Sequence, residues 1–316
     1  MELMLTPCTV QTDSRGREVT AHGTPAFPLG CYYDNLETEE VAWHWHEEME
    51  TIVVSEGEVV AKAGTEKYLL RQGEGMFINS GVLHAIKNVG TGFCSLHSFV
   101  FHPKLVAGSM DSIFWQKYVQ PLKEDVCLNS AAFRQGTEWG GEVLKLLESA
   151  WQACARKKNG YEFDVRSSLS EMIFLLTQHR PSSLPAPSEK EARDAERVKR
   201  MLEYIHVHYS DALTLPQIAA SAGLSSSECL RCFRSTIGLA PIQYVKQYRV
   251  QRAAEMLVGT PEKIVDIAMQ CGFQDMSYFA RSFRELKGCT PSRYREMMKR
   301  EQSQSISRSR EAAGDM

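Results

Sequence analysis

Three histidines and one glutamate in the N-terminal third have residue types and spacings that suit a metal ion. His44 and His46 are separated by one residue, Glu50 follows after three more, and His84 comes later in the chain. Because alternate residues of a strand share a face, His44 and His46 would project together. Two imidazoles, a carboxylate and a third imidazole from another strand can hold a divalent transition metal. The same four side chains could instead line a pocket for a small effector or serve only the fold.

A second informative group lies in the C-terminal third, where the sequence repeats itself. Ile218-Ala219 followed by Gly223 is echoed by Ile267-Ala268 followed by Gly272, and the two glycines lie 49 residues apart. Further residues match in the same order: Phe233 with Phe283, Gly238 with Gly288, Pro241 with Pro291, and Tyr244 with Tyr294. So many matches predict two copies of one structural unit.

Each copy carries the start and stop signals of two helices joined by a tight turn. Thr214–Gln217 has the composition of a capping box with proline in the first turn, so a helix begins there. Gly223 supplies the left-handed conformation that a sharp turn needs. Ser225–Glu228 is a second capping box, and Asp275 caps the equivalent helix of the other copy.

The second helix of each copy divides into a buried stripe and an outer face. The stripes are Cys229, Cys232, Phe233 and Ile237, then Phe279, Phe283 and Leu286. The outer residues are Ser227, Leu230, Arg231 and Arg234, then Met276, Ser277, Ala280, Arg281 and Arg284. A short helix, a glycine turn and a second helix with an Arg-bearing face is the geometry that enters a DNA major groove. The alternative is a helical bundle that merely happens to be basic.

Cysteine usage indicates a reducing compartment. Nine cysteines, an odd number, are scattered over 316 residues, which does not suit a disulfide framework. Cys229 and Cys232 have CxxC spacing, but no second CxxC or His pair follows at the spacing of a zinc module, so we expect core packing. The first ten residues lack the layout of a signal peptide, and no stretch approaches 18 apolar residues. These features favour a cytoplasmic protein without membrane contact.

Charge is distributed unevenly along the chain. Residues 1–189 carry 16 Lys and Arg against 24 Asp and Glu, whereas residues 190–300 carry 18 against 12. An acidic N-terminal part and a basic C-terminal part suggest that only the C-terminal part binds a polyanion. A chance excess of charge on a solvated face is the alternative, and the motifs decide between the two.

The order of patterns along the chain predicts several segments. Short strands with glycine turns fill residues 20–103: Thr51–Val54, Val59–Ala63, Lys67–Leu70, Gly75–Ile78 and Cys94–Phe101. Such strands indicate a sandwich or barrel. Residues 112–180 have helical spacing, and three prolines in residues 181–188 predict an extended linker. The tail from Gln302 is rich in Ser and charge, which predicts disorder.

Residues 198–296 resemble the DNA-binding domain of the AraC/XylS family of transcription regulators. The second copy carries the match most specifically, through Ile267-Ala268, Gly272-Phe273, Tyr278-Phe279, Arg281, Phe283-Arg284, Gly288, Thr290-Pro291 and Tyr294-Arg295. The sequence departs from the family where Cys229 and Cys232 replace larger apolar residues. The resemblance implies base contacts by Ser227, Leu230, Arg231, Ser277 and Arg281, and phosphate contacts by Lys246 and Arg284. One long helix from Pro241 to Val258 would hold both recognition helices on one face of double-stranded DNA.

Residues 25–100 resemble the two sequence motifs of the cupin barrel. The first motif contains His44, His46, Glu50 and Gly57, and the second contains Gly73, His84 and Asn88, with Asn79 where proline is usual and Thr38 where glycine is usual. Regulators of the AraC type commonly carry such a barrel as a sensor. The resemblance implies that His44, His46, Glu50 and His84 bind an effector, which could be a sugar, or a divalent transition metal.

The sequence therefore predicts an α+β multidomain regulator of transcription, controlled by a small effector and without enzymatic activity. The expected segments are a cupin-like barrel over 1–110, a helical dimerisation segment over 111–180, a linker over 181–189, an all-α domain with two helix-turn-helix motifs over 190–300, and a disordered tail over 301–316. A homodimer would double the DNA contacts, and an activator would also meet RNA polymerase. The rival from another class is a metal-dependent cupin enzyme fused to a DNA-binding domain.

Overall fold

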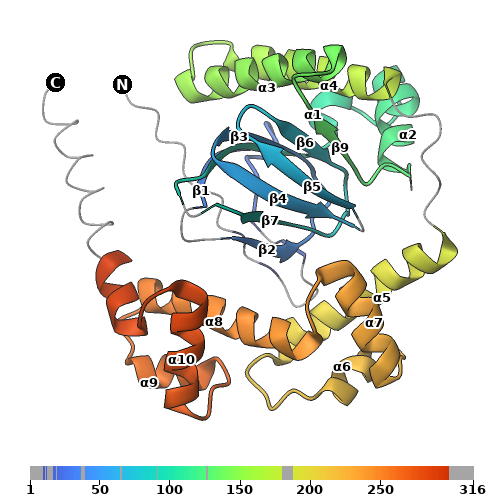
Figure 1. The fold of residues 1–316 in the computed structure, drawn as a ribbon. Helices are drawn as coiled ribbons and strands as arrows, with labels where there is room; N and C mark the ends of the chain where they lie inside the picture. Colours follow the sequence, from blue (N-terminus) through green and yellow to red (C-terminus); the bar gives the residue numbers. More distant parts are fainter. Residues whose placement is uncertain are drawn as a thin grey trace, which may run out of the picture. The chain divides into compact units, whose positions relative to one another are not determined.

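The computed structural model describes residues 10, 12, 17–18, 20–36, 40–64, 66–90, 92–125, 127–179 and 188–298. The chain divides into two compact units, Met1–Lys199 and Arg200–Met316. Within these described ranges the first unit is built on nine strands with helices beside them, and the second is helical (Figure 1). Of the linker predicted over 181–189, residues 181–187 lie outside the described residues, as does the tail predicted over 301–316, and a helix already begins at Glu189.

The first unit contains two antiparallel sheets. The five-stranded sheet has the order β1-β8-β3-β6-β9, and the four-stranded sheet has the order β2-β7-β4-β5. The strands are β1 (Leu29–Asn35), β2 (Val41–His44), β3 (Met49–Glu56), β4 (Glu58–Ala63), β5 (Glu66–Arg71), β6 (Gly75–Ile78), β7 (His84–Asn88), β8 (Ser95–Phe101) and β9 (Ser130–Phe133). Apolar residues from both sheets form one interior core, including Ile52, Val59, Leu70, Met76, Ile86 and Leu96. The arrangement is the predicted sandwich or barrel.

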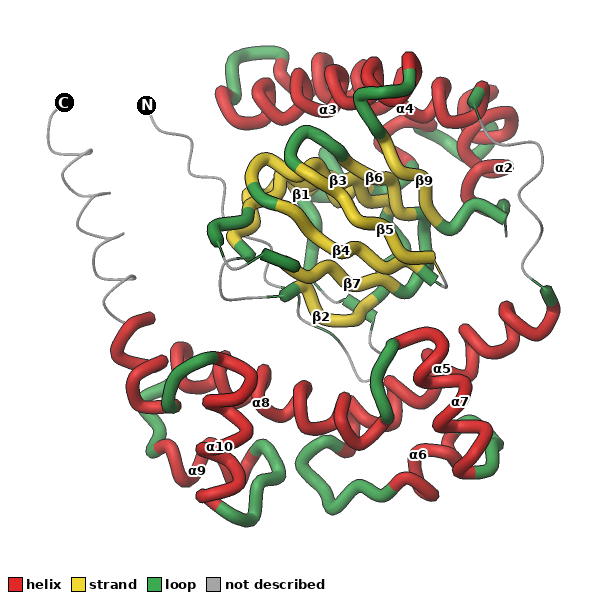
Figure 2. Tube along the Cα trace, in the orientation of Figure 1, coloured by secondary structure: helices red, strands yellow, loops and turns green. Residues whose placement is uncertain are grey.

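Helices cover the outer face of the five-stranded sheet (Figure 2). They are α1 (Lys104–Ala107), a π-helix η1 (Trp115–Val119), α2 (Gln120–Lys123), α3 (Glu138–Arg156) and α4 (Tyr161–Gln178). Val143 and Leu147 of α3 and Leu169 of α4 share a second core with Phe99 and Phe101 of β8. Packing against the sheet thus accounts for the apolar periodicity of these helices.

The predicted strands and long helices are present, with one local difference. Each of the five expected strands overlaps an observed one, and α3 and α4 carry the predicted helical stripes. The segment expected to be helical also contains β9, which pairs with β6 from Gly75↔Phe133 to Ile78↔Ser130. Four residues with two alanines carry too weak a period to distinguish a strand from a helix, and here the pairing with β6 decides.

The second unit is a chain of helices. They are α5 (Glu189–His208), α6 (Leu215–Ser221), α7 (Ser226–Ile237), α8 (Pro241–Gly259), α9 (Ile264–Gln270) and α10 (Met276–Lys287), and residues 291–298 are also helical. The α5 helix crosses the division between the units, and its buried residues Met201 and Ile205 belong to the second one. None of the helices in the described part of the chain is both long and apolar enough to cross a membrane.

The predicted helix signals act as expected. Capping boxes start α6 at Thr214 and α7 at Ser225, and the Asp275 side chain accepts a hydrogen bond from the Tyr278 amide at the start of α10. Gly223 and Gly272 have φ of +67° and +79° in the two turns. At Gly272 a Cβ would also lie 2.8 Å from the Tyr209 carbonyl oxygen, so both φ and space require glycine.

Buried side chains hold each helix-turn-helix together. Cys229, Cys232 and Phe233 are fully buried in the first copy, and Phe279 and Phe283 are fully buried in the second. The CxxC pair is therefore part of the core, as predicted, and the Cys229 thiol contacts the Met201 sulfur of α5 at 3.4 Å. Met276, expected on the outer face, is instead half-buried, because the first turn of α10 packs on the core of the second helix-turn-helix, which includes Phe279 and Phe283.

His206 makes the stability of the second unit depend on pH. Its ring is buried between Tyr244, whose hydroxyl lies 2.9 Å from Nε2, and Tyr248, on which it stacks. Burial, followed by the charge of Arg252, lowers the pKa of His206 to about 3. The unfolded chain then binds the extra proton more readily between pH 3 and 6.5, so stability falls as the pH drops through this window.

We expect the unfolding free energy of a fragment spanning 188–300 to be about 2 kcal/mol lower at pH 5 than at pH 7 through His206 alone. Urea unfolding followed by circular dichroism at the two pH values measures the difference. His206→Gln should remove that part of the slope, whereas His208→Gln, at a half-buried position on the same helix, should keep it. An unchanged slope in His206→Gln would refute the assignment.

Candidate functional site

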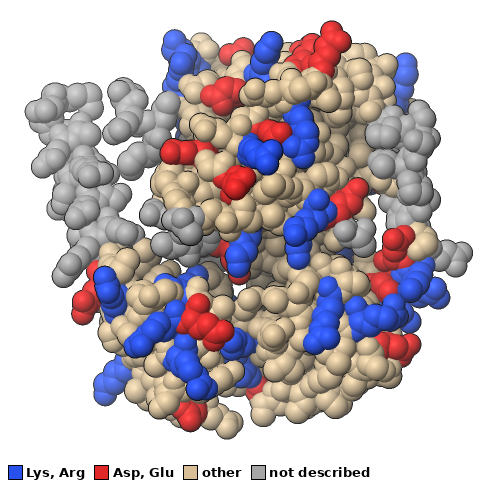
Figure 3. Space-filling view, in the orientation of Figure 1, with Lys and Arg blue, Asp and Glu red and all other residues tan. Residues whose placement is uncertain are grey.

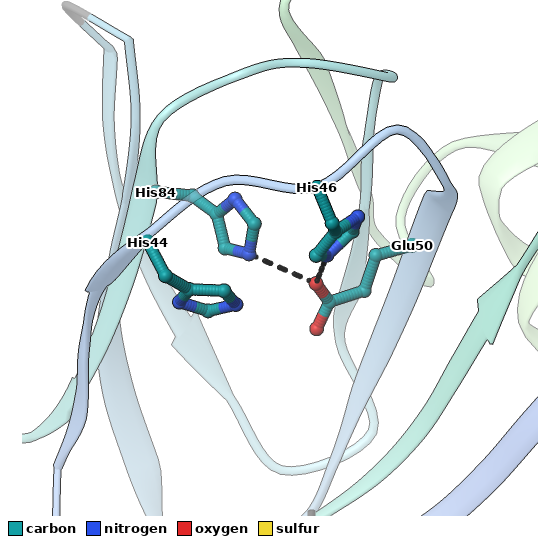
Figure 4. Close-up of side chains that lie close together, drawn as sticks. All are labelled: His44, His46, Glu50 and His84. Atoms are coloured by element: carbon teal, nitrogen blue, oxygen red, sulfur yellow. Dashed lines mark hydrogen bonds and ion pairs between the residues drawn. The ribbon is translucent and has the colours of Figure 1, made fainter. Parts of the chain in front are cut away.

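The four predicted ligand residues of the barrel converge (Figure 4). His44 ends β2, Glu50 lies in β3 and His84 begins β7, while His46 lies in the short connection between β2 and β3. Their ligand atoms all lie within 4.8 Å of one another, and all four residues are buried. The Glu50 carboxylate is 3.0 Å from Nε2 of both His46 and His84. The sequence thus predicted both the members of the cluster and their convergence.

The three imidazoles are oriented by the backbone. Nδ1 of His44 lies 2.8 Å from the Ala42 carbonyl oxygen, Nδ1 of His46 lies 3.1 Å from that of Glu48, and Nδ1 of His84 lies 2.8 Å from that of Val82. A carbonyl can only accept, so each Nδ1 carries the proton in a neutral ring and each Nε2 keeps a lone pair. Metal-binding histidines are usually held in this way.

Burial and neighbouring groups shift the pKa values of three residues in the cluster. Burial, then the nearby His84, lowers the pKa of His44 to about 3, so this ring is neutral at ordinary pH. Burial alone would raise the pKa of Glu50, but His84 and His46 hold it well below its usual range. Burial opposes a charge on His84, yet the Glu50 carboxylate raises its pKa. The centre therefore contains an ionised carboxylate among imidazoles.

These groups fit a divalent transition metal ion. Imidazole nitrogen and carboxylate oxygen bind zinc at about 2.0–2.2 Å, which separates neighbouring ligand atoms by about 3–4 Å, close to the spacing found here. The clamped rings direct Nε2 at the carboxylate, and Nε2 of His84 is buried without a hydrogen bond of good geometry. His44, His46, Glu50 and His84 would hold the ion.

Two further residues that the motifs did not indicate reach the cluster. Oε2 of Glu18 lies 3.6 Å from Nε2 of His44 and 3.3 Å from Nε2 of His22, and both Glu18 and His22 are buried. Glu18 and His22 precede the first strand, outside any periodic pattern. An acid and an imidazole four residues apart were the only available signal, and such pairs are common on protein surfaces.

A small internal cavity adjoins the cluster. Glu18, His44 and Glu50 line it together with Asp34 and apolar residues such as Ile52. Asp34 accepts a hydrogen bond of 2.8 Å from the Ser98 hydroxyl. The cavity holds about one water molecule, so it admits an ion but not a sugar unless the barrel opens.

The predicted DNA-facing residues lie on α7, α8 and α10. Ser227, Arg231, Arg234, Ser277, Arg281 and Arg284 are exposed, whereas Leu230 and Ala280 are half-buried. The Arg281 guanidinium lies over the Tyr278 ring, 5.6 Å from its centroid. Figure 3 shows Lys and Arg side chains over both halves of this unit, with acidic side chains among them. The exposure suits DNA contact, and the contacts themselves stay predictions.

Other basic residues of the unit hold the fold. Arg249 donates to the carbonyl oxygens of Tyr209 and Asp211 at 2.6 Å, in front of α6. Arg295 donates to those of Leu257 and Glu262 at 3.0 and 2.7 Å, in front of α9. Each arginine therefore braces the loop that enters a helix-turn-helix.

Lys246, predicted to contact phosphate, is already paired with an acid. Its ammonium lies 3.1 Å from the Glu285 carboxylate of α10. Because Glu285 is exposed, the pair can open at small cost when a phosphate competes. A phosphate contact by Lys246 would therefore require exchange of partners.

Both units of the chain resemble known proteins. The family model of the AraC-like ligand binding domain matches residues 28–172, and that of a helix-turn-helix domain matches residues 218–297. The uncharacterized HTH-type transcriptional regulator YdeC of Bacillus subtilis is 28% identical over 90% of this chain and 97% of its own. The HTH-type transcriptional activator RhaR of Mannheimia succiniciproducens is 24% identical over 87% and 89%, respectively. The structure of the AdpA DNA-binding domain with target DNA is 26% identical, covers 34% of this chain and 97% of its own, and gives a TM-score of 0.33.

Both units and both long relatives agree on one assignment. The chain belongs to the AraC family of transcription regulators. This AraC-family regulator joins an N-terminal ligand-binding domain of barrel type to a C-terminal domain with two helix-turn-helix motifs that bind double-stranded DNA. The predicted family, fold class and general function are confirmed.

Proposed function

We propose that a ligand bound at His44, His46, Glu50 and His84 controls how this AraC-family regulator binds DNA. The observation that carries the proposal is the convergence of four buried polar side chains inside the domain that matches the ligand-binding family. Burying a polar group costs free energy unless it is hydrogen-bonded, and burying a charge costs more unless it is paired or binds a metal. A ligand that binds one arrangement of the regulator better than another shifts the population toward it.

The geometry favours a divalent transition metal as part of that ligand. The backbone clamps three rings with Nε2 turned toward Glu50, and the adjoining cavity has room for about one water molecule. A sugar would need a larger space and donors and acceptors at several points. The ion would bind acceptor atoms of an effector as a Lewis acid, while the four residues hold it in place.

DNA binding by purified protein, with and without metal, tests this function. We expect a bound ion to change the affinity for an operator fragment measured by fluorescence anisotropy, at a fixed salt concentration since phosphate contacts make affinity depend on salt. Equal affinities for the metal-free and metal-loaded protein would contradict control by metal. The rival enzyme function predicts turnover of an organic substrate by the metal-loaded barrel.

The helical segment at 111–180 is proposed to pair two subunits, although it also packs on the sheet. Phe163 and Phe174 of α4 are large apolar side chains exposed by 78% and 46%. A dimer would bury them and present two pairs of recognition helices to DNA. Sedimentation of the wild type and of Phe163→Ser measures the dimer, and a monomeric wild type would exclude it. We propose contact with RNA polymerase only if the regulator activates transcription. We also propose that the protein acts in the cytoplasm.

We expect substitutions of Arg281 and Lys246 to have different effects on DNA binding. Arg281→Ala should cost roughly 1–3 kcal/mol and relax preference at one base pair, as loss of a bidentate guanine contact does. Lys246→Ala should weaken all sequences about equally and lower the salt slope by about 1. Binding of a set of operator variants at several salt concentrations distinguishes the two.

The Lys246 prediction has a matched control in Glu285. Glu285→Gln removes the acid that pairs with Lys246, so it should strengthen DNA binding at low salt for every sequence. If Arg281→Ala and Lys246→Ala both weaken all operators to the same extent, the assignment of the recognition face is wrong.

A further inference from the structure

Glu18 is held over the metal cluster by its own backbone. Its amide donates to the Trp45 carbonyl oxygen at 2.8 Å, and Arg17 forms a parallel bridge with Trp45. Trp45 separates His44 from His46 in the sequence, so the short segment that carries Glu18 runs directly beside the two ligands. Arg17 also pairs with Glu47 at 3.4 Å on the outer side, where both side chains are about half exposed and the pair contributes little.

The Glu18 side chain belongs to a polar chain that runs from the half-buried Tyr32 to the buried cluster. The Tyr32 hydroxyl lies 2.8 Å from Nδ1 of His22, and Nε2 of His22 lies 3.3 Å from Oε2 of Glu18. The same oxygen lies 3.6 Å from Nε2 of His44, beside the four residues whose ligand atoms lie within 4.8 Å of one another. His22 and Tyr32 thus direct one carboxylate oxygen toward the lone pair of a ligand histidine.

The negative charges of Glu18 and Glu50 favour a cation at this position. Glu18 and Glu50 are both nine-tenths or more buried beside one group of imidazoles. Two buried carboxylates repel each other and lose hydration unless a positive charge lies between or beside them. A divalent cation balances both charges, whereas a neutral sugar or an anionic effector balances neither.

We propose that Glu18 is a fifth protein ligand of the centre, with His22 and Tyr32 as positioning residues. This inference rests on the metal site proposed above. Five protein ligands exceed the four of a closed tetrahedral zinc site. The centre should therefore prefer manganese, iron, cobalt or nickel ions, which accept five or six ligands, over the tetrahedral preference of zinc.

Cobalt titration of the full chain tests the proposal, because the visible absorption of Co²⁺ is strong in tetrahedral sites and weak in five- or six-coordinate ones. The wild type, stripped with a chelator, should give the weak spectrum. Glu18→Gln should weaken Co²⁺ binding by about 10–100-fold and raise the absorption per bound ion. The matched control is Glu47→Gln on the exposed neighbour of the segment, which should leave both the affinity and the spectrum unchanged.

Other outcomes separate the two levels of the proposal. If Glu18→Gln keeps the wild-type affinity and spectrum, Glu18 is not a ligand and only the four-residue centre remains. If the wild type binds no Co²⁺, the metal site itself is refuted. Tyr32→Phe keeps Glu18 but removes the end of its orienting chain, so it should weaken binding a few-fold. This variant decides the case if Glu18→Gln does not fold, and an unchanged affinity would then overturn the proposal.

Discussion

His46→Ala is expected to leave the purified regulator without a bound metal ion and without a ligand-dependent change in DNA affinity. The His46 ring contributes one of four ligand atoms, lies 3.0 Å from the Glu50 carboxylate and is only 2% exposed. Alanine removes the nitrogen and also leaves Glu50 with one partner fewer. Since even the groups that orient metal ligands are worth about 10–100-fold in affinity, loss of a ligand should cost at least as much.

Elemental analysis of protein purified without chelator measures the first effect, and operator binding with and without added ion measures the second. His97→Ala is the matched control, because His97 lies in β8 of the same barrel but stacks on Trp151 and pairs with Glu148, away from the cluster. It should retain the metal. Wild-type protein without metal, combined with a lost effector response in His46→Ala, would favour an organic effector bound directly by the four residues.

The cluster of His44, His46, Glu50 and His84 could be predicted because local chemistry and strand geometry agree at these positions. HxH spacing turns two rings to one side wherever the backbone is extended, and the second motif supplies the third ring from β7, which pairs with β2 at His44↔His84. The helix-turn-helix copies were predictable for the same reason. Their capping residues, turn glycines and apolar stripes act over four or five residues, within the range that a sequence pattern can reveal.

What the sequence could not predict depends on contacts between distant segments. Glu18 reaches His44 only because its backbone pairs with Trp45, and no periodicity marks that pairing. The Lys246–Glu285 pair joins α8 to α10 through side chains 39 residues apart. Strand β9 exists because β6 offers a free edge to residues of weak preference. In each case the tertiary partner, not local propensity, determines the outcome.

Phe283→Ala is expected to lower the unfolding free energy of the DNA-binding domain by about 3–5 kcal/mol. The Phe283 ring is fully buried, contacts Phe279 and Tyr294 at centroid distances of 5.7 and 5.4 Å, and joins α10 to the helix that follows it. Alanine leaves a cavity at the centre of the core of the second helix-turn-helix. Because a domain of this size has only about 5–15 kcal/mol of stability in total, the second helix-turn-helix should open before the first.

Urea unfolding of the 188–300 fragment measures the loss, and footprinting on an operator shows where it acts. We expect protection of one major-groove segment to disappear while the other persists, since the first copy has its own core around Phe233 and Tyr244. Arg284→Ala, one residue further along α10 and exposed, should leave the fragment's stability within about 0.5 kcal/mol while weakening DNA binding. If Phe283→Ala removes both protected segments at the same urea concentration, the two copies unfold as one unit, and α8 couples them more tightly than their separate cores suggest.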